Sequence, residues 1–69
     1  MPKIPPKKPK EVIKILENNG FVFVRQKGSH RMYVNEKFGV TVPYHSQELK
    51  PKTLRYIIRQ SGLDIEKFL

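Results

Sequence analysis

The chain has 69 residues, no cysteine and two histidines, and its 14 lysine and arginine residues against six acidic ones give a net charge of +8. This length allows a single domain with a small core, and the absence of cysteine excludes disulfides and thiolate metal sites. Because no apolar run approaches the roughly 18 residues of a membrane span, we expect a cytoplasmic protein, and its charge favours RNA or DNA, or else an acidic protein, as partner.

The first nine residues form a basic, proline-rich segment. Prolines stand at positions 2, 5, 6 and 9, and the first ten residues contain four lysines and no acid. Proline lacks a backbone donor and restricts the residue before it. We therefore predict a flexible arm over residues 1–9 and a single domain over residues 10–69.

A short amphipathic helix is expected over PKEVIKILENNGF. Apolar residues recur at helical spacing between Val12 and Leu16. Pro9 suits the first helical position, and Gly20 suits a left-handed cap at the other end. Phe21 should then fold back onto Leu16.

Three strands should follow this helix. FVFVRQ (21–26) and HRMYVN (30–35) are aromatic and β-branched, and VTVP (40–43) is a short strand ended by proline. Residues 27–29 form the turn between the first two strands, and NEKFG (35–39) forms a second hairpin loop. Alternation in the second strand puts His30, Met32 and Val34 on one face; we expect the helices to cover this more apolar face.

A second helix, PKTLRYIIRQSG, is opened by Pro51 and capped by Gly62. DIEKFL reads as a final helical turn with Asp64 as its N-cap. The order predicts an α+β fold of two layers, α-β-β-β-α, in which a three-stranded antiparallel sheet carries two helices on one face.

His30 is the residue best suited to chemistry, because it opens its strand at the border of the sheet. Histidine exchanges protons near neutral pH, Lys27 and Arg31 flank the turn, and Gly28 lets a substrate backbone approach. RNA carries its own nucleophile, the 2′-hydroxyl, so one base among cations suffices to start cleavage. The alternative is an ordinary hairpin whose histidine is only structural, and the residues alone favour that alternative.

Other side chains have two interpretations each. His45, in the loop before the second helix, is either an acid that protonates the leaving 5′-oxygen or a residue bonded to backbone. Lys52, Arg55 and Arg59 form a basic stripe that either grips phosphates or is merely solvated, and Tyr33 either stacks on a base or is an aromatic on a half-exposed sheet. No metal-ligand spacing and no glycine-rich nucleotide loop occurs, so we expect neither metal nor cofactor.

The segments LENNGFVFVRQKGSHRMYV and VTVPYHSQELKPKTLRYIIRQSGL resemble the HicA family of bacterial and archaeal toxins, from about Lys10 to Leu63. The shared motifs are a helix ending NGF, GSH before a basic residue and an aromatic strand, VP-H, and K-P-x-T-L. Many relatives have glycine where this chain has Lys52. The resemblance implies a fold like a double-stranded-RNA-binding domain, ribonuclease activity on messenger RNA, catalysis by His30, and a HicB antitoxin that covers the site.

We therefore predict a toxin of a toxin–antitoxin pair, an endoribonuclease that cleaves mRNA by metal-independent acid/base chemistry with the 2′-hydroxyl as nucleophile. A non-catalytic RNA-binding module and a module that docks an acidic protein are the alternatives. The predicted site comprises the catalytic His30, its setting of Lys27, Gly28, Ser29 and Arg31, the possible second acid or base His45, and the RNA-binding residues Lys52, Arg55, Arg59 and Tyr33.

Overall fold

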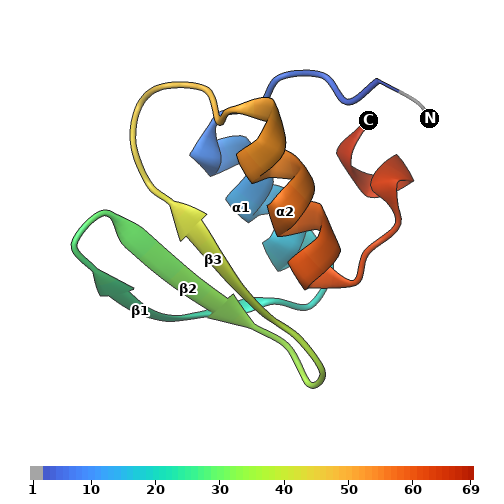
Figure 1. Ribbon diagram of the computed structural model, residues 1–69. Coiled ribbons are helices and arrows are strands. Elements are labelled where there is room, and N and C mark those ends of the chain that lie inside the picture. The colour runs from blue at the N-terminus through green and yellow to red at the C-terminus, as the bar shows by residue number, and fades with distance from the viewer. Residues whose placement is uncertain (1–2) are drawn as a thin grey trace.

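The computed structural model describes residues 3–69, so the first two residues of the predicted arm lie outside it. A helix is followed by an antiparallel three-stranded sheet, a second helix and a short 3-10 helix (Figure 1). This order confirms the predicted α+β class. The elements are α1 (Pro9–Asn18), β1 (Val22–Lys27), β2 (His30–Val34), β3 (Gly39–Pro43), α2 (Pro51–Ser61) and η1 (Ile65–Phe68).

Helix α1 begins and ends at the predicted residues. Pro9 occupies its first turn, where a missing N–H costs nothing, and the side chain of Glu11 accepts a hydrogen bond from the Lys8 N–H at 3.0 Å. Gly20 follows with a φ of +89°, and the N–H of Phe21 donates to the Leu16 carbonyl. Phe21 is thereby turned into the core.

Helix α2 also follows its sequence signals. It begins at Pro51 and ends before Gly62, whose φ of +68° is the left-handed conformation that glycine adopts without strain. The buried hydroxyl of Ser61 donates to the Ile58 carbonyl and accepts from the Leu63 N–H, so this end is satisfied internally. Asp64 stands at the predicted N-cap of η1, without a capping hydrogen bond from its side chain.

The sheet has the order β1-β2-β3 and one irregularity. Strand β2 pairs with β3 in unbroken register, whereas the register with β1 runs from Phe23 opposite Tyr33 to Arg25 opposite Met32 and passes over Val24. Val24 is therefore a β-bulge. A bulge reverses the alternation of the strand beyond it and so changes which side chains share a face.

The core lies between the helices and the face of the sheet that carries Tyr33, Val40 and Val42. The prediction that the helices cover His30, Met32 and Val34 is therefore wrong. The prediction counted Met32 and Val34 as the more apolar set, but the large ring of Tyr33 buries more apolar surface on the opposite face. This ring packs edge-on against Phe23, with the ring centroids 5.7 Å apart. We call the opposite face, which carries His30, the open face.

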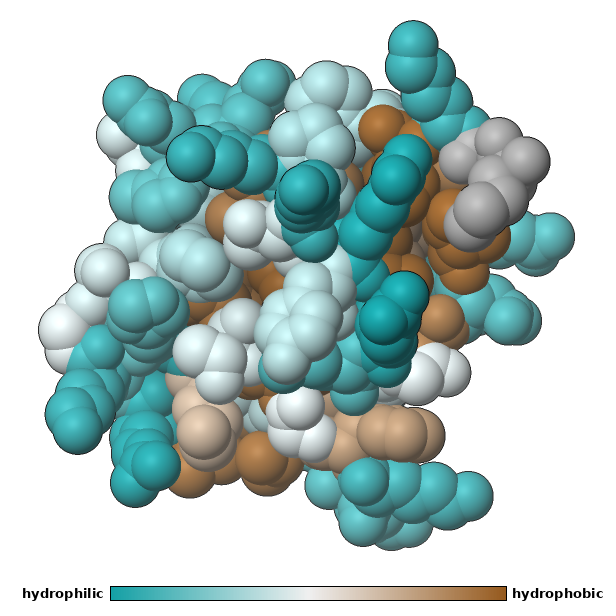
Figure 2. All heavy atoms as spheres, in the orientation of Figure 1, coloured by the Kyte–Doolittle hydropathy of each residue, from teal (hydrophilic) through white to brown (hydrophobic). Residues whose placement is uncertain are grey.

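The described part of the arm lies against the domain. Ile4 packs on the core, and the Lys7 carbonyl accepts a hydrogen bond from the Leu49 N–H at 2.9 Å. Hydrophilic residues cover most of the side of the molecule seen in Figure 2, and hydrophobic ones are visible mainly near the two termini and beside the β2–β3 hairpin. Among the helices of residues 3–69, none has the length and apolar character needed to cross a membrane.

Candidate catalytic site on the open face

The β1–β2 turn positions the candidate histidine. Lys27 pairs directly with His30, so the turn between them has only two residues, Gly28 and Ser29. Gly28 has a φ of +58°, a conformation that two-residue hairpins need and that glycine supplies without strain. His30 is exposed at the start of β2, next to Lys27 on the neighbouring strand.

This turn is held from the helix-covered face of the sheet. The Gln26 side chain donates to the Gly28 carbonyl and accepts from Arg31 Nε, both at 2.9 Å. The Arg31 guanidinium lies 3.6 Å from the centre of the Tyr44 ring, and the Tyr44 N–H donates to the Ser29 carbonyl at 2.6 Å. The turn is thus joined to the β3–α2 loop by backbone and side-chain contacts.

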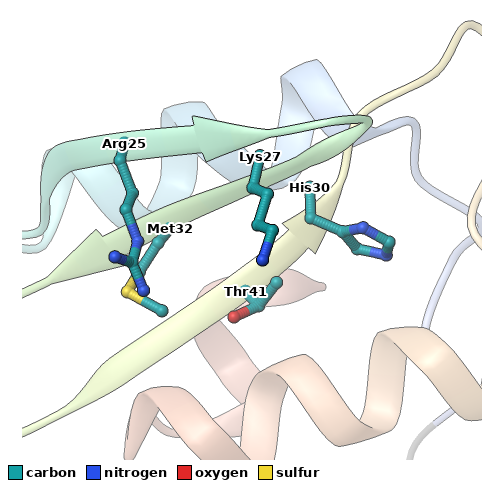
Figure 3. Close-up of a pocket in the computed structure, with 5 residues that line it drawn as sticks. All are labelled: Arg25, Lys27, His30, Met32 and Thr41. Atoms are coloured by element: carbon teal, nitrogen blue, oxygen red, sulfur yellow. The ribbon is translucent and has the colours of Figure 1, made fainter.

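The open face carries a concavity of about 370 Å³ beside this turn. Two cationic side chains, Arg25 and Lys27, line this concavity. The other lining residues are the imidazole of His30, the thioether of Met32 and the hydroxyl of Thr41. In Figure 3 the Arg25 and Lys27 side chains extend from β1 over β2, and His30 stands at the start of β2 with its ring turned away from the Lys27 side chain. None of the five lining residues is acidic, so the concavity favours an anionic ligand.

The second histidine lies at the same end of the sheet. His45 is exposed and directly follows Tyr44, whose N–H holds the Ser29 carbonyl. It does not line the concavity.

Two predicted site residues face the other side of the sheet. Tyr33 is only 2% exposed, so the predicted stacking of its ring on a base is wrong. Arg31 stands next to His30 in sequence but pairs with Val42 on the helix-covered face and stacks on Tyr44. It therefore holds the turn and does not border the concavity.

The basic stripe of α2 is exposed but separate from His30. Lys52, Arg55 and Arg59 all project from α2, in the helix layer, and none lines the concavity. Arg55 instead borders a second groove, with Lys3 and Leu49, between the arm and the start of α2. A phosphate-binding role of this stripe stays a prediction.

Sequence reasoning missed Arg25. Strict alternation after Phe23 would place Arg25 on the helix-covered face, directly opposite Arg31. The bulge at Val24 moves it to the open face, opposite Met32. Like charges opposite each other in a sheet repel, so the Arg25–Arg31 clash in a regular pairing was the available signal of a bulge.

The fold and the concavity define a small basic α+β domain with one uncovered sheet face suited to an anion. Within residues 3–69, no three histidine, aspartate or glutamate side chains gather as a metal site. The family model described as HicA toxin of bacterial toxin-antitoxin matches residues 9–63, and the chain belongs to this family. It is therefore the toxin component of a toxin–antitoxin system, which implies a cognate antitoxin. No curated protein matches the chain.

Proposed function

We propose that this toxin is an endoribonuclease that cleaves messenger RNA in the cytoplasm, without a metal, at the open face. The observation that carries the proposal is the exposed His30 beside Lys27, on a concavity without an acidic lining residue. Membership of the toxin family supports a destructive activity, and the resemblance of the GSH turn supports His30 as its centre.

His30 acts as the general base in this reaction. It removes the proton of a ribose 2′-hydroxyl, and the 2′-oxygen attacks the adjacent phosphorus. The bond from phosphorus to the 5′-oxygen breaks, which leaves a 2′,3′-cyclic phosphate and a 5′-hydroxyl. Lys27 stabilises the additional negative charge that develops on the phosphoryl oxygens. An acid must protonate the departing 5′-oxygen, and His45, at the same end of the sheet, is the candidate.

Replacing His30 with alanine tests the proposal. A lost general base typically lowers the rate by about 10²–10⁴-fold. We expect this loss in cleavage of a labelled RNA by purified His30→Ala protein, with an unchanged thermal midpoint because the side chain is exposed. His45→Ala, measured in parallel, separates an acid from a bystander, since only an acid gives a comparable loss.

Two conditions complete this test. A 2′-O-methyl group at the cut site should abolish cleavage because it removes the nucleophile, and EDTA should leave the rate unchanged. Equal degradation by wild type and His30→Ala protein contradicts the catalytic role. Loss of cleavage in EDTA contradicts the metal-independent mechanism.

The cognate antitoxin, on this proposal a HicB-like protein, covers the same face. The cationic lining offers an acidic partner complementary charge, and His30 is part of this lining. Titrating purified antitoxin into a complex with fluorescent RNA tests the overlap. A shared surface gives competition, whereas separate surfaces give a ternary complex.

A further inference from the structure

Arg25 stands on the open face only because of the β-bulge at Val24. Beyond the bulge Arg25, Gln26 and Lys27 pair with successive residues of β2, so Arg25 and Lys27 share the face of His30. Gln26 points to the other face and binds Arg31 there. The bulge therefore brings a second cation beside the candidate catalytic residue.

Side chains on the open face form two rows across the three strands. In the first row, Lys27 pairs with His30, which pairs with Pro43. In the second, Arg25 pairs with Met32, which pairs with Thr41. The rows are two residues apart along each strand, about 6.6 Å, which is close to the separation of neighbouring phosphates along a single RNA strand.

The second row has the chemistry of a nucleotide subsite. Arg25 presents a planar fork of donors that matches two phosphate oxygens. Met32 and Thr41 are half-buried beside it and offer an adaptable apolar surface and a hydroxyl. Figure 3 shows the Arg25 side chain lying along Met32, with Thr41 beyond it on β3.

The positive charges of Arg25 and Lys27 also repel each other. Arg25 and Lys27 lie on one face of one strand, and the concavity they share has no acidic lining residue to offset their charges. An anion bound between them would attract both cations and offset their mutual repulsion. Such an arrangement disfavours the empty fold slightly, and it fits a ligand that carries more than one negative charge.

We propose that the row of Arg25, Met32 and Thr41 binds the nucleotide next to the cleaved bond, with Arg25 holding its phosphate. This inference rests on the proposed ribonuclease function, since the first row is where the cleaved phosphate lies. Arg25 then acts in binding and register, and His30 acts in chemistry.

Binding of a short 2′-O-methyl RNA, which resists cleavage, separates this role from catalysis. We expect Arg25→Ala to weaken binding about ten-fold or more, the fold-change of a lost hydrogen bond to a charged group. The slope of log affinity against log salt should fall by about 0.7 for one single-strand phosphate contact. Arg25→Lys should restore only part of the affinity, because lysine keeps the charge and loses the fork.

Lys14→Ala is the matched control, because it removes one exposed charge from α1, in the other layer. It should bind within about two-fold of wild type, since lone surface charges away from a site have small effects. With unmodified RNA, Arg25→Ala should raise KM and leave kcat nearly unchanged, the opposite of His30→Ala.

The outcomes separate the two proposals. If wild type cleaves RNA and Arg25→Ala binds no more weakly than Lys14→Ala, the subsite is overturned and the ribonuclease stands. If wild type does not cleave while Arg25→Ala alone weakens binding, the ribonuclease fails and the row survives as a phosphate-binding site. If Arg25→Ala has the same salt slope as wild type and Arg25→Lys binds as weakly as Arg25→Ala, no phosphate contact exists and the inference is wrong.

Discussion

Lys27 and Arg31 flank the same turn, but Lys27 is placed to act in the reaction and Arg31 to stabilise the fold. Lys27 lines the open-face concavity with His30. Arg31 lies on the helix-covered face, where it stacks on Tyr44 and is hydrogen-bonded to Gln26. Arg31→Ala removes a cation–π contact and a hydrogen bond, which together stabilise the fold by about 1–2 kcal/mol. We expect its thermal midpoint to fall by several degrees, with most of the rate retained at saturating RNA.

Lys27→Ala should behave in the opposite way. Its side chain is exposed, so the free energy of unfolding should stay within about 0.5 kcal/mol of wild type. The cleavage rate should fall about ten-fold or more, because Lys27 lies where charge develops in the reaction. Thermal unfolding and saturating kinetics on both variants check this contrast. A larger loss of rate in Arg31→Ala at an unchanged midpoint would place Arg31 in the reaction and contradict the assignment.

Helix α2 ends against the β2–β3 hairpin. A Cβ at Gly62 would stand 2.5 Å from two ring atoms of Phe38, and its backbone φ is +68°. Gly62→Ala therefore combines left-handed strain, about 1–2 kcal/mol, with displacement of the ring. We expect a total loss of about 2–3 kcal/mol in the free energy of unfolding, measured by denaturant titration.

Gly28 supplies the matched control for this loss. It has a similar φ of +58°, but nothing lies within 4 Å of a Cβ built there. Gly28→Ala should therefore lower the free energy of unfolding only by the left-handed strain. Gly62→Ala in a Phe38→Ala background should lower it by no more than Gly28→Ala does. Equal losses for the two glycine variants in the wild-type background would mean that the Phe38 ring moves aside freely.

The elements were predictable where a local signal decides them. Pro9, Gly20, Pro51 and Gly62 mark helix ends through backbone chemistry that needs no tertiary contact, and the fold class followed from the order of elements. Which face the helices cover was not predictable by counting apolar residues, because Tyr33 alone outweighed two smaller side chains.

The site was predictable only in part, for the same physical reason. His30 and Lys27 are neighbours because a two-residue turn pairs them, whereas the sequence predicted a turn over residues 27–29 that included Lys27. Arg25 lies on the same face as His30 and Lys27 because of the bulge, whereas Arg31 lies on the other face and stacks on Tyr44, 13 residues further along the chain. Both effects depend on pairing between strands and loops, which no short motif encodes.

Cationic side chains lie on both layers of a thin molecule. The extents are 32 × 26 × 17 Å, with Arg25 and Lys27 on the open face of the sheet and the Lys52–Arg59 stripe on α2. RNA that touches both surfaces must pass around the molecule. The net charge of +8 attracts RNA from every side, but only the open face holds the candidate catalytic histidine.

RNA length should therefore separate the two surfaces. An oligonucleotide of about four residues, the lower end of single-strand site sizes, can lie on the open face alone. Its affinity should respond to Arg25→Ala and be insensitive to Arg55→Ala or Arg59→Ala. With about 12 residues or more, RNA can pass the β3 edge and reach α2, so the α2 variants should then weaken binding and reduce the salt slope. Fluorescence anisotropy on 2′-O-methyl RNAs of increasing length measures this. If the α2 variants weaken the shortest RNA as strongly as Arg25→Ala does, RNA enters from the helix layer and not across the open sheet.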